Sequence, residues 1–135
     1  MAFLLFFFAF NIHGLEFSYL CESIEILIIR ETAKGNLEQK LTSLEYIEDA
    51  VKRGTAYINE IIQVLEFLYV DAIENNRDAD GFNQVREKTA MCLGYITTEE
   101  ARRILLFILQ NDDDENVLAA ALESLGKIAS DGNEG

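Results

Sequence analysis

Apolar residues recur every three or four positions along most of the chain, which is the spacing of one face of an α-helix. From residue 18 onward this spacing defines a series of segments separated by short polar or glycine-containing breaks. None of the segments shows the two-residue alternation of a half-buried β-strand. The pattern therefore predicts an all-α fold with helices at residues 18–33, 37–52, 56–74, 84–96, 98–110 and 116–129.

Local signals predict where some of these helices begin and end. Gly54 follows the helix at 37–52 and is expected at the C′ position, where glycine is common. Thr97 and Glu100 match a capping box, so Thr97 is expected as the N-cap of the next-to-last helix. The acidic run at 112–115 is expected to form a turn that caps the last helix. The sequence contains no proline, so no helix is forced to break.

A Leu-x-x-Ile pattern occurs three times, at residues 44–47, 93–96 and 125–128. The last two copies are 32 residues apart and the first two are 49 apart, the excess falling mostly in the polar stretch at 75–83. Each copy lies in a helix that follows another helix, which predicts an α-solenoid of stacked antiparallel helix pairs. The glycines inside the last two copies, Gly94 and Gly126, are poor helix formers and are expected where neighbouring helices approach closely.

The residues in and before these copies resemble the second half of a HEAT repeat. The resemblance is carried by Val85-Arg86-Glu87-Lys88-Thr89-Ala90 with Leu93-Gly94-Tyr95-Ile96, and by Asp112-Asp113-Asp114-Glu115-Asn116-Val117 with Ala119-Ala120-Ala121-Leu122 and Leu125-Gly126-Lys127-Ile128. It is similar to the short bacterial HEAT-like repeats also found in the phycocyanobilin-lyase group. The resemblance extends over 84–130, weakens over 37–70 and is absent from 1–35. It implies a scaffold or binding surface without catalysis of its own.

The chain begins with nine consecutive apolar residues at positions 2–10, and the first charged side chain is Glu16. The run is too short to span a bilayer but fits the apolar core of a signal peptide, with Gly14 before the cleavage site. Residues 1–14 are therefore predicted to be a signal peptide of a periplasmic or secreted protein. The alternative is a retained N-terminal arm that packs against the domain of a cytoplasmic protein.

The remaining chain divides into an N-terminal helical segment at 15–36 and a HEAT-like repeat domain at 37–135. Leu125 and Ile128 lie in the last segment with no polar capping helix after them. Because terminal repeats normally carry a polar outer face, a truncated array or a chain end that packs on a partner is expected.

Composition narrows the possible functions. A net charge of −13 argues against nucleic acid as the main ligand, because nucleic acid binds clustered Lys and Arg. Two cysteines, Cys21 and Cys92, and one histidine are too few for a four-ligand zinc site, and both cysteines are expected as buried thiols. No nucleophile motif or phosphate loop is present, so neither an enzyme nor a cofactor is expected.

The polar stretch between the third and fourth predicted helices partly matches an EF-hand loop. The ligand positions would be filled by Asn76, Asp78, Asp80 and Glu87, with Gly81 at the turn. Asn76 stands where Asp is expected, and no second loop is present to pair with it. The interpretation is therefore an inter-helix loop, with a calcium site as the alternative.

The exposed side of the second helices is the expected binding surface. Tyr46, Tyr95 and Lys127 occupy the same place in the three copies of the pattern, and Lys88 and Glu123 are predicted to lie beside them. The function expected is a non-enzymatic scaffold that binds a protein partner. The alternatives are an enzyme-associated module of the lyase-type HEAT family and a calcium-dependent binder.

Overall fold

The structure is a computed structural model that describes residues 14–134, with side chains described for residues 20–130. This part of the chain forms helices throughout, as the periodicity predicts. They are α2 (Gly14–Ala33), α3 (Leu37–Lys52), α4 (Ile58–Glu74), α5 (Phe82–Leu93), α6 (Glu99–Asn111) and α7 (Glu115–Glu134).

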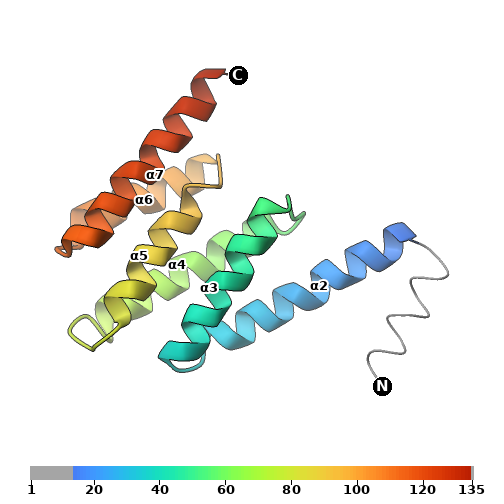
Figure 1. The fold of residues 1–135 in the computed structure, drawn as a ribbon, viewed down its shortest axis with the longest axis horizontal. Helices are drawn as coiled ribbons and strands as arrows, with labels where there is room; N and C mark the ends of the chain where they lie inside the picture. Colours follow the sequence, from blue (N-terminus) through green and yellow to red (C-terminus); the bar gives the residue numbers. More distant parts are fainter. Residues whose placement is uncertain (1–13, 135) are drawn as a thin grey trace.

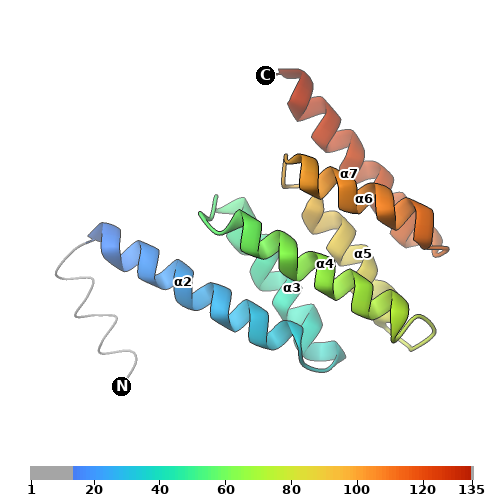
Figure 2. The same ribbon diagram turned by 180° about the vertical axis from the view of Figure 1, so that it is seen from behind.

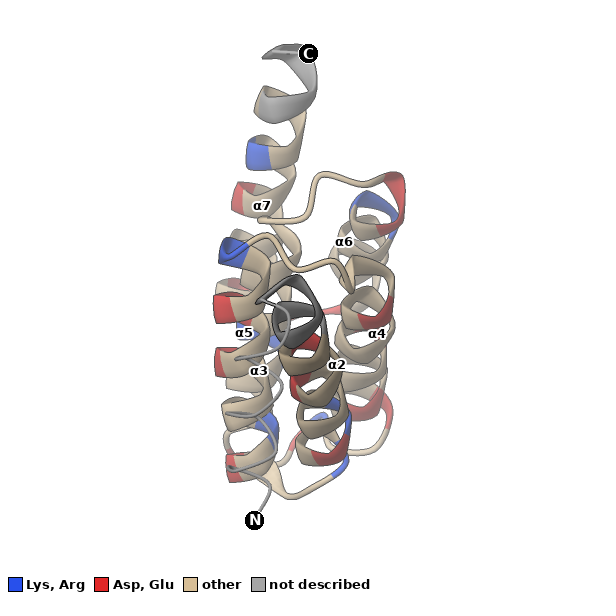
Figure 3. Ribbon diagram, turned by 90° about the vertical axis from the view of Figure 1, so that its right-hand side faces the viewer, with Lys and Arg blue, Asp and Glu red and all other residues tan. Residues whose placement is uncertain are grey.

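The helices form antiparallel pairs that stack side by side. α2 packs on α3, α4 on α5 and α6 on α7, so each pair consists of a first helix and a second helix. The first helices α2, α4 and α6 make one layer, and the second helices α3, α5 and α7 make the other (Figures 2 and 3). The pairs with α2 and α7 lie at opposite ends of the stack (Figure 1). This arrangement is the predicted α-solenoid.

The stack begins earlier in the chain than the sequence pattern suggested. Residues 15–36 were expected as a separate helical segment, but α2 packs on both α3 and α4 as the first helix of the first pair. The predicted signal peptide lies outside the described residues apart from Gly14, the first residue of α2. Export therefore stays a prediction. None of the helices in the described range is long and apolar enough to cross a membrane.

The predicted helix ends are partly correct. Gly54 follows α3 with a positive φ of 77°, and the next amide N–H, of Thr55, donates to the Ala50 carbonyl as in a Schellman motif. The N-cap of α6 is Thr98, whose hydroxyl accepts from the Ala101 N–H, so the expected Thr97 is wrong by one residue.

A capping box does occur at the start of α3. The side chain of Asn36 accepts from the Gln39 N–H, and the Gln39 side chain accepts from the Asn36 N–H. The sequence analysis missed it because the motif uses Asn and Gln in place of the commoner Thr and Glu.

The second helices align differently from the motif copies. The Cys92 thiol lies 3.8 Å from the Leu44 carbonyl, and the Ser124 hydroxyl donates to the Ala90 carbonyl at 2.7 Å. Cys92 and Ser124 are 32 residues apart, as the repeat predicts, and each contacts a carbonyl of the second helix before its own. The two residues that they contact, Leu44 and Ala90, are therefore equivalent as well. The offset between α3 and α5 is therefore 46 residues, and Ile47 rather than Leu44 is equivalent to Leu93.

Burial supports this alignment. With an offset of 46, the buried charged residues Lys40 and Arg86 fall in the same place, as do the buried Ser43 and Thr89. The expected offset of 49 is wrong by about one helical turn, because Leu44 and Ile47 belong to the same apolar stripe. Fully buried apolar side chains in the second helices include Leu44, Ile47, Val85, Leu93 and Val117.

The predicted close approach of a neighbouring helix is confirmed at Gly94, but the same prediction is wrong at Gly126. A Cβ atom on Gly94 would lie 2.8 Å from the Cβ of Ser124 and 3.1 Å from its Cα. A Cβ atom on Gly126 would meet nothing within 4 Å. The difference arises because α7 covers Gly94, whereas no described helix covers the equivalent position on α7.

Candidate functional site

Two of the predicted surface residues come together on the layer of second helices. The Lys127 ammonium of α7 lies 4.8 Å from the centre of the Tyr95 ring, and the Lys52 ammonium of α3 lies 5.0 Å from it. These distances are within the range of cation–π contacts. Tyr95 follows α5, so the three side chains connect all three second helices; they are called the Tyr95 cluster below.

The cluster is open to solvent and only partly neutralised. Tyr95 is 37% exposed. Lys52 also donates to Glu48 at 2.8 Å, and this hydrogen bond is the main reason that the pKa of Lys52 is raised. Lys127 has no carboxylate within ion-pair distance among the described side chains. The cluster therefore presents positive charge and an aromatic ring together, which suits a carboxylate-bearing segment.

The other predicted surface residues are more scattered. Lys88 lies in a narrow groove between α3 and α5, lined also by Glu48 and Met91, and Met91 is 46% exposed. Glu123 is exposed on α7. Tyr46 does not correspond to Tyr95 but to Cys92 and Ser124, and it lies near α2 at the first end of the stack. All three residues belong to the layer of second helices, but Tyr46 faces the groove beside α2 at the first end of the stack and is not part of the Tyr95 cluster.

Charges of both signs lie on both layers of the stack (Figure 3). The second helices carry exposed acidic side chains such as Glu45, Asp49 and Glu123 beside Lys52 and Lys127. The acidic side chains of the second helices are therefore interrupted by the Tyr95 cluster.

A buried ion pair that the sequence analysis did not identify connects the middle and last pairs. Arg86 of α5 donates to the Asp112 carboxylate at 2.9 Å, and both side chains are almost fully buried. The hydroxyl of Tyr69 donates to the same oxygen at 3.1 Å, and the Asp114 N–H donates to the other. Burial and the Asp112 charge together raise the pKa of Tyr69. Both oxygens of the Asp112 carboxylate are therefore hydrogen-bonded within the junction of the two pairs.

Both cysteines are free thiols in the structure. Cys92 is buried as expected, and burial raises its pKa to about 12. Such a thiol stays protonated near neutral pH and is a poor nucleophile. Cys21 is only half-buried, contrary to expectation, and lines a groove at the first end of the stack.

The loop between α4 and α5 does not have the form of an EF-hand. α5 begins at Phe82, so Glu87 lies in its second turn, and Asn76 is directed to the Asp71 carbonyl and carboxylate at 3.4 and 3.5 Å. Among the described residues no three acidic, cysteine or histidine side chains are grouped to hold a metal ion. Gly81 has the positive φ of 88° that the sequence led us to expect at a tight turn, and its role is to start α5.

The repeat geometry agrees with one comparison. Residues 70–134, from the end of α4 through α7, match the family model of HEAT repeats. No curated protein and no solved structure matches the chain. The match supports a HEAT-repeat protein, and it covers the part of the chain where the 32-residue period is regular.

Proposed function

We propose that the protein is a non-enzymatic scaffold that binds a protein partner through its layer of second helices, with the Tyr95 cluster at the centre. HEAT repeats commonly mediate protein interactions, and residues 70–134 match them. The observation that carries the proposal is the exposed Tyr95 ring between the ammonium groups of Lys52 and Lys127, supplied by three separate repeats. Aromatic and cationic side chains grouped in this way are typical centres of binding energy.

The chemistry of the buried groups supports a non-enzymatic function. The Asp112 carboxylate is held by Arg86 and Tyr69, and the Cys92 thiol has its pKa raised to about 12. Neither group is available near neutral pH as a base or a nucleophile. The partner segment that fits the cluster carries carboxylates, because it would meet two ammonium groups and an aromatic face.

A charge-reversal pair tests the proposed surface. Immobilised wild-type protein is used to capture partners from the native source, beside Lys127→Glu and the matched control Arg102→Glu. Arg102 is also exposed, but it lies on α6 in the layer of first helices. We expect Lys127→Glu to lose the captured protein and Arg102→Glu to retain it, with unchanged thermal unfolding in both variants.

Two results would contradict the proposal. Full capture by Lys127→Glu would place the binding surface elsewhere on the molecule. Equal loss in both variants would show a general effect of net charge rather than a local site.

A further inference from the structure

An open groove lies on the layer of first helices, between α2 and α4. Its lining residues are Arg30, Ala33, Lys34, Gln63, Val64 and Phe67, and its volume is about 220 Å³. The two helices pack on each other, and Figure 2 shows them side by side in this layer. The six residues are called the α2–α4 groove below.

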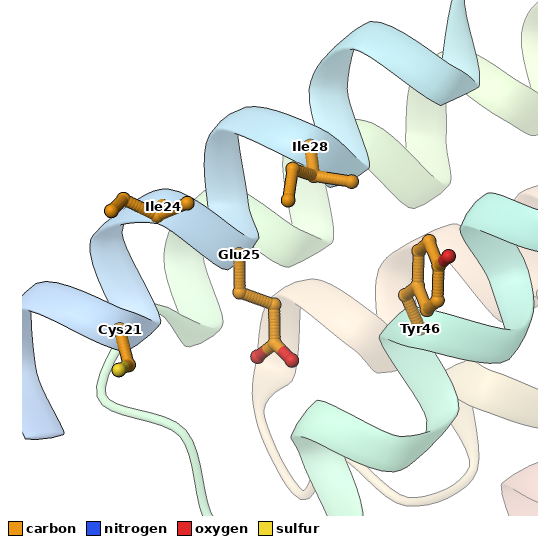
Figure 4. Close-up of a pocket in the computed structure, with 5 residues that line it drawn as sticks. All are labelled: Cys21, Ile24, Glu25, Ile28 and Tyr46. Carbon is orange, nitrogen blue, oxygen red and sulfur yellow. The ribbon is translucent and has the colours of Figure 1, made fainter. Parts of the chain in front are cut away.

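The charge of the α2–α4 groove differs from that of the groove beside Tyr46 (Figure 4). The one charged residue that lines the groove beside Tyr46 is Glu25, and its carboxylate accepts from Arg53 at 2.5 Å. Both charged residues that line the α2–α4 groove are cationic, in a chain with 24 acidic and 11 basic side chains. The α2–α4 groove is therefore a local exception to the acidic composition.

The positive charge of the α2–α4 groove is largely uncompensated. The Arg30 side chain makes no ion pair or hydrogen bond with another described residue. Lys34 lies 3.7 Å from Glu31, and these two side chains are 67% and 78% exposed, so their pair contributes little. Arg30 and Lys34 are four residues apart and so lie one turn from each other on the same side of α2. They can therefore pair with carboxylates that approach along the groove.

The buried Lys40 of α3 holds the groove in shape from below. Its ammonium donates to the Ala33 carbonyl at 2.7 Å and lies 3.3 Å from the Asp71 carboxylate. The same ammonium lies 5.3 Å from the centre of the Phe67 ring, which remains 44% exposed. These contacts join the end of α2 to α4, so the apolar surface of Phe67 is in place before a partner arrives. A surface that is ordered in advance lowers the cost of binding.

We propose that the α2–α4 groove binds an acidic peptide segment of a partner protein. One apolar side chain of the segment packs on Phe67, and carboxylates beside it pair with Arg30 and Lys34. The groove is smaller than the roughly 300–1,000 Å³ of typical small-molecule sites, so it suits a single side chain of a longer chain. The layer of first helices lies on the other side of the stack from the Tyr95 cluster (Figure 3), so this site is separate from the surface proposed above.

A fluorescent reporter in the groove tests the proposal. The chain contains no tryptophan, so Phe67→Trp adds a single reporter and keeps an aromatic ring beside Lys40. The probe is a synthetic peptide with leucine between two runs of three glutamates, and the control peptide has alanine in place of the leucine. We expect the leucine peptide to shift the tryptophan emission to shorter wavelengths. The alanine peptide is expected to bind about tenfold more weakly, because it buries less apolar surface.

Charge reversals in the reporter protein test the cationic side of the groove. Arg30→Glu is expected to weaken binding of the leucine peptide about tenfold or more, because repulsion replaces attraction. Lys34→Glu changes a more exposed side chain, is expected to act in the same direction, and replaces Arg30→Glu if that variant unfolds at a lower temperature. The matched control Arg102→Glu reverses an exposed charge on α6 in the same layer and is expected to keep the affinity within about twofold.

Several results would overturn the proposal. They are the absence of an emission shift with the leucine peptide, equal affinity for the two peptides, and equal loss in Arg30→Glu and Arg102→Glu. A shift that occurs without peptide and grows as the protein dimerises would assign the groove to a second copy. A shift lost in Lys127→Glu and kept in Arg30→Glu would place the peptide at the Tyr95 cluster. Failure of Lys127→Glu to affect partner capture would leave this test unchanged, because the reporter responds to the α2–α4 groove alone.

Discussion

The middle pair, α4 and α5, differs from the two end pairs mainly in how many neighbours cover it. α5 is packed against α3 on one side and α7 on the other, whereas described helices cover α3 and α7 on one side of the layer only. Equivalent positions show the effect: Leu93 is fully buried and Leu125 only partly, and Ala90 is fully buried while Leu122 is 60% exposed. The same repeat position is therefore a core position or a surface position, depending on its place in the stack.

The largest difference in stability is expected when the buried cation between two neighbouring helix pairs is replaced. Arg86→Met leaves Asp112 buried without its charged partner, so the free energy of unfolding is expected to fall by about 3–5 kcal/mol. Lys40→Met removes the equivalent partner of Asp71, which is 20% exposed and can be hydrated, so its loss is expected to be smaller. Urea unfolding of both variants measures the difference, and an equal or larger loss for Lys40→Met would contradict the effect assigned to the hydration of Asp71.

The apolar positions give the next comparison. Leu93→Ala empties a site that is enclosed on both sides and is expected to cost about 2–5 kcal/mol. Leu125→Ala changes the equivalent, partly exposed site at the end of the stack and is expected to cost less. Chemical denaturation of the two variants tests the order, and a reversed order would mean that α7 is covered by something beyond the described helices.

The two glycines are expected to respond with opposite signs. Gly94→Ala forces a methyl group against the Ser124 Cβ and backbone, so a loss of about 1–3 kcal/mol is expected from overpacking. Gly126→Ala adds a methyl group in open space within α7, so a gain of up to about 1 kcal/mol is expected from helix propensity. Thermal unfolding measures both, and destabilisation by Gly126→Ala would show that α7 has a close neighbour.

The last comparison concerns alkaline pH at the junction of α3 and α5. Burial, reinforced by Glu48, raises the Cys92 pKa to about 12, so ionisation above about pH 8.5 favours the unfolded chain. The stability that comes from keeping the buried thiol protonated is fully present below that pH. It is lost as the pH rises toward 12, by at most about 1.4 kcal/mol per pH unit. The urea midpoint of the wild type is expected to fall between pH 8 and 10, and the midpoint of Cys92→Ser is expected to fall less over the same range. Tyr69 acts in the same direction at higher pH, equally in both proteins.

Local sequence signals were sufficient for much of the fold. The spacing of apolar residues located each helix from α2 to α7 to within a few residues, and the 32-residue period placed α5 and α7 in equivalent positions. Gly54 was placed correctly because a positive φ after a helix is a local requirement. These features depend on residues within one or two helical turns of each other.

The candidate site was predicted less completely. The sequence suggested Tyr95 and Lys127 as surface residues, but their contact and the part played by Lys52 depend on the stacking of three helices. Tyr46 was assigned to the same surface because the apolar stripe of α3 repeats every three or four residues. A shift of one turn leaves such a stripe almost unchanged, so the sequence pattern alone does not fix the register between α3 and α5.

The sequence by itself determined the helices, the pairing of neighbours in the chain and the acidic character of the protein, because all of these follow from short-range periodicity and composition. Only the tertiary structure decided which side of each helix is covered. It joined Arg86 to Asp112 across 26 residues, placed Ser124 over Gly94, and left Tyr46 beside an open groove. These outcomes depend on how whole helices pack against each other, and the energy of that packing is spread over contacts between residues distant in the chain.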